Sequence, residues 1–138
     1  MKKLHVHVSV NDLEQSKKFY TDLFSKEPDK VKIDYIKWDL DNPPVNFAIS
    51  TQNEAGLDHI GIQVEDAGEL EDLYQRIGPI DATKKAEGET VCCYARSVKT
   101  WIQDPQGINW ELFHSLNDEE VYRDSSPSDC CTEQKACC

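Results

Sequence analysis

The chain has 138 residues, with 26 acidic and 15 basic side chains and a formal net charge of −11. This balance argues against nucleic acid as a partner, because binding to a phosphate backbone needs clustered Lys and Arg. No apolar run approaches the roughly 18 residues of a membrane helix, and the N-terminal MKKLHVHVSV has no secretory signal. We therefore expect a cytoplasmic protein with reduced thiols that binds neither nucleic acid nor membrane.

Composition divides the chain into one compact domain and an appendage. A domain of this size can be stable without disulfides or structural metal. Residues 117–138 lack Ile, Leu, Phe and Trp and hold six acidic against two basic residues, which is typical of a disordered tail. The domain is therefore expected to span residues 1–116 and the tail residues 117–138.

An internal repeat with a period of 54 residues (59 − 5) organises the domain. Residues 5–12 (HVHVSVND) and 59–66 (HIGIQVED) share a histidine, an alternation of apolar and polar residues, and a later aspartate. Each copy therefore begins with a strand.

A helix is predicted after each of these strands. The first has an N-cap candidate at Asn11, and its apolar residues recur at helical spacing at Leu13, Tyr20, Leu23 and Phe24. The second stops at Gly78-Pro79, and its apolar residues are Leu70, Leu73, Tyr74 and Ile77.

Three strands are expected after each helix, at 31–34, 35–41 and 45–50 and then at 83–88, 93–102 and 108–114. The order is a βαβββ module, present twice, at about 1–52 and 56–116. The sequence predicts an α+β fold, in which two modules form a curved eight-stranded mixed sheet around a metal cavity, with the helices outside.

Strand alternation assigns candidate metal ligands to the inner face of this sheet. In the first strand Leu4, Val6, Val8 and Val10 share one side, so His5 and His7 lie on the other. His59 is in phase with His5, and Glu111 faces away from the apolar side of the last strand. His5, His59 and Glu111 would form a 2-His-1-carboxylate set, which suits an Fe(II) oxygenase.

The alternative is that these histidines are polar residues on a half-solvated sheet face. His5 is preferred to His7 as a ligand because His59 aligns with His5 in the repeat. His7 is expected to lie beside the ligands without binding the metal. His114 lies on the apolar side of its strand, where a structural role is expected.

The six cysteines form three adjacent pairs, Cys92-Cys93, Cys130-Cys131 and Cys137-Cys138. Neighbouring cysteines bridge each other poorly, because disulfide geometry strains the peptide between them. Two adjacent thiolates can instead hold a soft, thiophilic ion such as trivalent arsenic or cadmium. A disulfide framework is the weaker interpretation.

Several motifs carry a family resemblance. Residues 5–24, LDHIG at 57–61 and DPQGINWE at 104–111 resemble the vicinal-oxygen-chelate superfamily of glyoxalases and extradiol dioxygenases, across essentially all of residues 1–116. TVCCYA at 90–95, KTW at 99–101 and the cysteine-bearing tail are similar to the organoarsenical carbon–arsenic lyases and the related cadmium-induced proteins.

The narrower resemblance implies a nonheme Fe(II) dioxygenase that cleaves the carbon–arsenic bond of methylarsonous acid and trivalent aromatic arsenicals and releases arsenite. It implies that His5, His59 and Glu111 hold Fe(II), that dioxygen is the co-substrate, and that Cys92 and Cys93 capture the arsenical. Some cadmium-induced relatives have glutamine at the position of His5, so a histidine here favours the enzyme.

The other candidate pocket residues are His7, Tyr94, Lys99 and Trp101, with aromatic packing the expected role of Trp101. The tail thiols Cys130, Cys131, Cys137 and Cys138 would deliver arsenicals or bind released arsenite, or form a dispensable scavenging appendage.

Three alternative functions stay open. A cadmium- or arsenite-binding resistance protein would bind soft metal without consuming oxygen. A glyoxalase or fosfomycin-type transferase does not call for Cys92-Cys93, and an extradiol dioxygenase acting on catechols leaves these thiols unexplained. The expected assembly is a monomer or a homodimer, because paired modules complete the cavity within one chain or across a dimer.

Overall fold

The computed structural model describes residues 2–118 of the chain. The first module contains β1 (Lys3–Ser9), α1 (Leu13–Phe24), β2 (Lys30–Val31), β3 (Tyr35–Asp41) and β4 (Pro44–Ser50). The second contains β5 (Gly56–Val64), α2 (Ala67–Ile77), β6 (Lys84–Cys92), β7 (Ala95–Gln103) and β8 (Asn109–Asp118). Both modules therefore have the predicted βαβββ order. The predicted tail from residue 119, with Cys130, Cys131, Cys137 and Cys138, lies outside the described residues.

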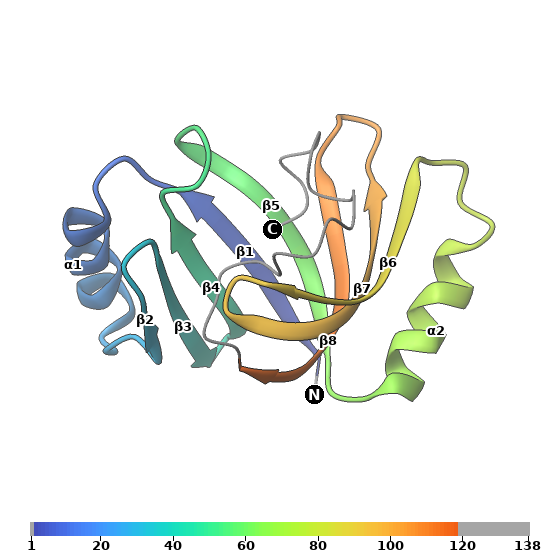
Figure 1. Ribbon diagram of the computed structural model, residues 1–138, viewed down its shortest axis with the longest axis horizontal. Helices are drawn as coiled ribbons and strands as arrows, with labels where there is room; N and C mark the ends of the chain where they lie inside the picture. Colours follow the sequence, from blue (N-terminus) through green and yellow to red (C-terminus); the bar gives the residue numbers. More distant parts are fainter. Residues whose placement is uncertain (1, 119–138) are drawn as a thin grey trace.

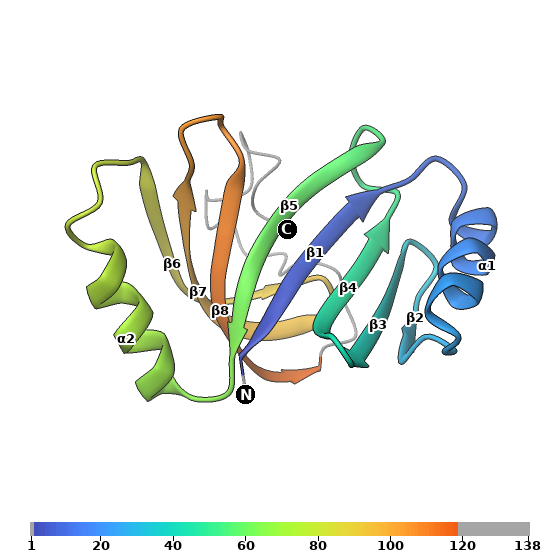
Figure 2. The ribbon, with the colours of Figure 1, turned by 180° about the vertical axis from the view of Figure 1, so that it is seen from behind.

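All eight strands form one mixed sheet in the order β2-β3-β4-β1-β5-β8-β7-β6. The modules meet at the antiparallel pair β1 and β5, which lie side by side at the centre of Figure 2. Within each module the first strand pairs in parallel with the last, β1 with β4 and β5 with β8. The predicted α+β fold with a curved eight-stranded sheet is confirmed.

The two helices lie at opposite ends of the molecule, each on the outer side of its module (Figure 1). Both begin at equivalent positions of the repeat, because Asp12 accepts from the Gln15 N–H at 3.0 Å and Asp66 accepts from the Glu69 N–H at 2.8 Å. The first N-cap is therefore Asp12, one residue after the predicted Asn11. Neither helix of residues 2–118 is long and apolar enough to cross a membrane.

Each helix covers its own apolar core. Under α1 the buried residues are Ile36, Trp38, Phe47 and Ile49. In the second core Leu70 and Leu73 of α2 pack against Val64 and Leu112 of the sheet. The valines of β1 pack against the first core, as the alternation predicts. The inner face of the sheet carries the buried histidines and Glu111, beside a third, smaller apolar cluster of Tyr35, Ala48 and Tyr94.

Four strand boundaries differ from the predicted ones by two or more residues. Strand β2 ends at Val31, and β6 continues to Cys92 rather than ending at 88. Strand β7 begins at Ala95 because Cys93 and Tyr94 form a turn, with φ angles of 55° and 59°. Strand β8 runs to Asp118, two residues beyond the predicted domain boundary, because Asn117 and Asp118 still pair with β7.

Gly61 allows β5 and β8 to approach closely. A Cβ atom at this position would lie 2.2 Å from the backbone oxygen of Glu111. Replacing Gly61 with alanine should therefore lower the free energy of unfolding by about 3 kcal/mol, the cost of overpacking a close contact. Urea unfolding measures this loss, and Gly78→Ala is the matched control, because its Cβ meets ordinary contacts at 3.5 Å. An unchanged stability of the Gly61 variant would contradict the close approach.

Candidate metal centre and thiol pair

The predicted ligands meet at the junction of β1, β5 and β8. His5 is the register partner of Gly61 on β5, and Gly61 is the partner of Glu111 on β8. His7 and His59 are direct partners in the next row across β1 and β5. Because Gly61 carries no side chain, nothing stands between His5 and Glu111 in their row. The backbone thus gathers four donor side chains from three adjacent strands.

These side chains are buried, and their donor atoms are close together. His5 Nε2 lies 3.1 Å from His59 Nε2, and His59 Nε2 lies 3.2 Å from Glu111 Oε2. The exposed fraction is 5% for His5, 0% for His59 and 4% for Glu111. The alternative of polar residues on a half-solvated face is wrong, because this face is more buried than the valine face of β1.

The spacing fits a divalent transition metal. Two donors at right angles on an ion with bonds of about 2.1 Å lie about 3.0 Å apart. The His5 Nδ1 is 3.1 Å from the Asn46 backbone oxygen, and His59 Nδ1 is 2.7 Å from Asp58 Oδ2. Each acceptor holds a proton on Nδ1, which leaves the Nε2 lone pair for a metal.

Charge compensation keeps Glu111 ionised. Burial raises the pKa of a carboxyl group, but Lys99 and the neighbouring histidines outweigh burial and hold the pKa of Glu111 well below its ordinary value. Lys99 is itself 3% exposed, and its Nζ lies 3.4 Å from Glu111 Oε1. The carboxylate is therefore available as an anionic ligand.

The pKa values of the candidate ligands His5 and His59 move in opposite directions. Burial lowers the pKa of His5 to about 4. Burial also disfavours the charged form of His59, but its hydrogen bonds to Asp58 and Glu111 outweigh burial and raise its pKa. His5 is thus neutral near pH 7, the state that binds metal.

His7 belongs to the same cluster. One ring nitrogen each from His5, His7 and His59 lie within 4.8 Å of one another. His7 is 1% exposed, and its Nε2 is hydrogen bonded to Ser50 Oγ at 2.8 Å. His7 therefore lies against the predicted ligands, where the repeat phase expects a surrounding residue.

The vicinal cysteines lie at the tip of the β6–β7 hairpin. Cys92 is the last residue of β6, and Cys93 and Tyr94 are the central turn residues, both at positive φ. Such φ values at two residues define the type I′ turn, which normally uses Asn or Gly. The two sulfur atoms are 3.5 Å apart. Cys92 is part of a disulfide in this structure, which differs from the expected reduced state, while Cys93 keeps its thiol.

The hairpin reaches across the inner face to the first module, and Figure 1 shows its curved strands passing toward β3 and β4. Tyr94 donates a hydrogen bond from its hydroxyl to Asp34 Oδ1. Lys30 Nζ donates to the Tyr94 backbone oxygen at 3.0 Å. The Tyr94 ring lies 5.9 Å from the Tyr35 ring. These contacts hold the cysteines over the inner face of the sheet.

A small cavity of about 40 Å³ joins the cysteines to the candidate metal ligands, since Cys92, Cys93, His5, Lys99 and Glu111 all line it. Of the other predicted pocket residues, Tyr94 anchors the hairpin to Asp34, and Trp101 packs against His59. The Trp101 ring is 5.0 Å from the His59 ring, and its Nε1 donates to Glu87 Oε1 at 2.9 Å.

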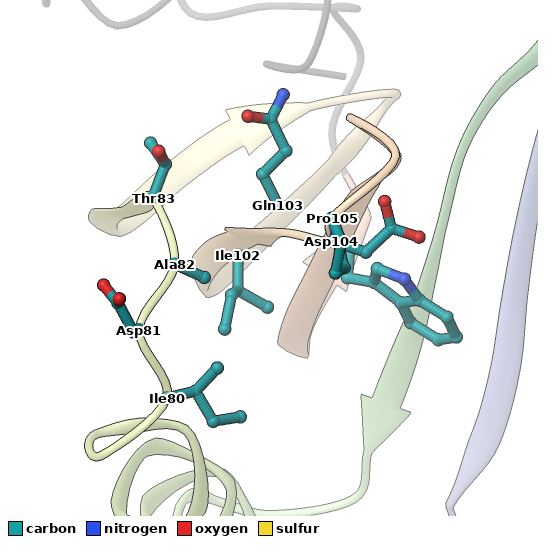
Figure 3. Close-up of a pocket in the computed structure, with 9 residues that line it drawn as sticks. Ile80, Asp81, Ala82, Thr83, Ile102, Gln103, Asp104 and Pro105 are labelled. Atoms are coloured by element: carbon teal, nitrogen blue, oxygen red, sulfur yellow. The ribbon is translucent and has the colours of Figure 1, made fainter.

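A larger cavity of about 490 Å³ lies elsewhere, between the segment after α2 and the β7–β8 turn. Figure 3 shows the Ile80 and Ile102 side chains reaching into it from its two sides. It contains none of the metal-ligand or cysteine residues. His114 lines a third cavity, beside Lys3 and Gln63, that none of the candidate metal ligands lines.

Asp58 is a residue of this site that the sequence did not single out as functional, although it directly precedes His59 in the LDHIG motif. Its Oδ2 accepts from His59, and its Oδ1 accepts from Asn53 Nδ2 at 2.8 Å and from Ser9 Oγ at 3.4 Å. Asp58 therefore fixes the orientation of the His59 ring.

Asp58→Asn should weaken divalent metal binding about 10- to 100-fold, because the amide is a poorer acceptor for the His59 N–H. Competition with a coloured chelator measures the affinity. Asp66→Asn makes the same chemical change at the N-cap of α2 and should leave metal affinity unchanged. Equal affinities for the two variants would remove Asp58 from the site.

The two βαβββ modules, with histidine and carboxylate side chains converging where they meet, are matched by a known superfamily. Residues 3–112 match the model of the Glyoxalase/Bleomycin resistance protein/Dioxygenase superfamily. The chain belongs to this superfamily.

Similar proteins match nearly the whole chain. The chain is 37% identical to a trivalent organoarsenical cleaving enzyme of Bacillus sp. (strain MD1), covering 100% of this chain and 91% of the relative. It is 29% identical to the cadmium-induced protein CadI of Mycobacterium bovis, covering 99% and 97%. The Mn(II)-bound glyoxalase of Novosphingobium aromaticivorans shares the fold, with a TM-score of 0.63, 16% identity, and coverage of 92% of this chain and 44% of that one.

Proposed function

We propose that this protein is an Fe(II)-dependent dioxygenase that cleaves the carbon–arsenic bond of trivalent organoarsenicals and releases arsenite. The observation that carries the proposal is the shared cavity, in which Cys92 and Cys93 lie with His5 and Glu111. The organoarsenical cleaving relative at 37% identity supports the same activity. The cytoplasmic location and the monomeric or homodimeric state stay predictions.

The reaction balances with one molecule of dioxygen. Methylarsonous acid, CH3As(OH)2, and O2 give formaldehyde and arsenite, As(OH)3. The methyl carbon loses four electrons, dioxygen gains four, and arsenic stays trivalent. In this proposal His5, His59 and Glu111 hold Fe(II), which supplies the activation of dioxygen when bound.

The cysteines supply substrate capture. Two thiols replace the two hydroxyls on arsenic, and two water molecules leave with the thiol protons. Two bonds of about 2.3 Å, the length of a zinc–thiolate bond, at an angle near 100° require sulfur atoms about 3.5 Å apart, and the observed separation is 3.5 Å. Because Cys92 is in a disulfide here, capture requires its reduction first.

Lys99 serves both parts of the site. Its ammonium group compensates Glu111 on one side and lines the cavity with Cys93 on the other. A buried cation favours the thiolate form of a nearby cysteine, which is the form that attacks arsenic. Capture then holds the arsenic–carbon bond beside the metal ligands and converts an encounter in solution into a positioned reaction.

The test uses the full chain, reduced with a phosphine, desalted and loaded with Fe(II) without air. Methylarsonous acid is added, air is admitted, and arsenite is measured by chromatographic speciation. We expect arsenite from the loaded protein and none from metal-free protein. Bound arsenical without arsenite would favour the alternative of a cadmium- or arsenite-binding resistance protein without catalysis. Turnover of catechol in place of the arsenical would favour an extradiol dioxygenase.

A further inference from the structure

His7 has a buried ring nitrogen that plays no part in the proposed set of His5, His59 and Glu111. Its Nδ1 is buried and has no hydrogen-bond partner among residues 2–118. A buried polar nitrogen without a partner is costly, and native structures rarely leave one without a reason. The side chain is 1% exposed, so bulk water does not satisfy it.

We propose that His7 is itself a metal ligand, so that the centre offers four protein donors, His5, His7, His59 and Glu111. The inference rests on the proposed metal site and deepens it. It assigns the centre an affinity for divalent cations that prefer imidazole, such as Co(II), Ni(II) and Zn(II), through a three-histidine set.

The geometry of the three histidines supports this assignment. Opposite donors on an ion with bonds of about 2.1 Å lie about 4.2 Å apart, and adjacent donors lie about 3.0 Å apart. The three ring nitrogens lie within 4.8 Å of one another. This upper limit exceeds the separation of opposite donors by about 0.6 Å, a difference that a rotation of one imidazole ring can remove.

Ser50 completes the arrangement for His7 as the other acceptors do for His5 and His59. With the His7 proton on Nε2, this atom donates to Ser50 Oγ at 2.8 Å, and Nδ1 keeps its lone pair. Each of the three histidines thus has one nitrogen held by an oxygen on a neighbouring residue or strand, and one nitrogen available for metal.

The direct pairing of His7 with His59 across β1 and β5 explains why the donors converge. The two His7 and His59 rings have centroids 4.8 Å apart. With four protein donors on a six-coordinate ion, two positions stay open to small molecules, compared with three for the His5, His59 and Glu111 set alone. His7 therefore tunes which metal the centre selects and how many exchangeable positions that metal keeps.

The experiment titrates the reduced full chain with Co(II) without air and follows the d–d absorption bands, which report coordination number. Sulfur-to-cobalt charge-transfer bands report any thiol binding separately. The variants are His7→Ala and His7→Phe, the second of which keeps a ring in place and removes both nitrogens. His114→Ala is the matched control, because His114 lines a different cavity.

We expect both His7 variants to bind Co(II) at least about 10-fold more weakly and to show altered d–d bands, with His114→Ala unchanged. Glu111→Gln should keep measurable Co(II) binding through the three histidines, and the double variant with His7→Ala should lose it. Wild-type affinity and spectrum in both His7 variants would overturn the assignment. If the wild type itself did not bind Co(II), this result would instead contradict the metal site in the proposed function.

Discussion

Glu111→Gln is expected to slow arsenite release at least about 100-fold and to weaken Fe(II) binding about 100-fold. The substitution removes the anionic donor of the proposed triad, and a carboxamide is a much weaker ligand for Fe(II). Fe(II) affinity is measured by anaerobic competition with a chelator, and arsenite release by speciation. Wild-type Fe(II) affinity in this variant would remove Glu111 from the ligand set.

The loss of the carboxylate has a second effect, on stability. Lys99 is buried, and its Nζ lies 3.4 Å from Glu111 Oε1. Removing one partner of a buried ion pair costs about 3 to 5 kcal/mol. A double variant, Glu111→Gln with Lys99→Met, removes both charges and should recover most of that stability without recovering Fe(II) binding. This pair of variants separates ligand loss from unfolding.

Cys93→Ser should reduce arsenite release at least about 100-fold while leaving Fe(II) affinity unchanged. A serine hydroxyl replaces sulfur by an oxygen that gains nothing over the hydroxyls already on arsenic, so the two-point attachment is lost. Without it the arsenical must meet the centre from solution, and the positioned reaction becomes a bimolecular one. Unchanged Fe(II) affinity in the variant shows that the centre is intact.

A truncation after residue 118 determines which cysteines capture the substrate. Arsenite release that survives truncation but is lost in Cys93→Ser assigns capture to the β6–β7 hairpin. Arsenite release that is lost on truncation and survives in Cys93→Ser would contradict that assignment and move capture to the tail.

The fold could be predicted because the sequence repeats. A histidine and an aspartate each recur after 54 residues, which predicts two equivalent strand–helix units. The two aspartates, Asp12 and Asp66, are the N-caps of the helices. Strand alternation then places His5, His7 and His59 on one face. Alternation along a strand predicts the face of a side chain well, because a shift of one residue moves a side chain to the other face of a sheet.

The burial of that face could not be predicted in the same way. A hairpin from the second module covers it, and the turn at Cys93 and Tyr94 uses positive φ angles without the Asn or Gly that normally signal them. Its docking depends on a long-range contact, from Tyr94 to Asp34, that no local pattern contains. For the same reason the sequence did not identify Asn46 and Ser50, which hold the histidine rings from β4.

In the proposed reaction the buried centre and the thiol pair act together on one trivalent arsenical with dioxygen. The most direct measurement is oxygen uptake by the reduced, Fe(II)-loaded chain, recorded with an oxygen electrode while arsenite is quantified in the same sample. We expect one molecule of dioxygen to be consumed for each arsenite and each formaldehyde formed. Arsenite formed without oxygen uptake, or oxygen uptake without arsenite, would contradict it.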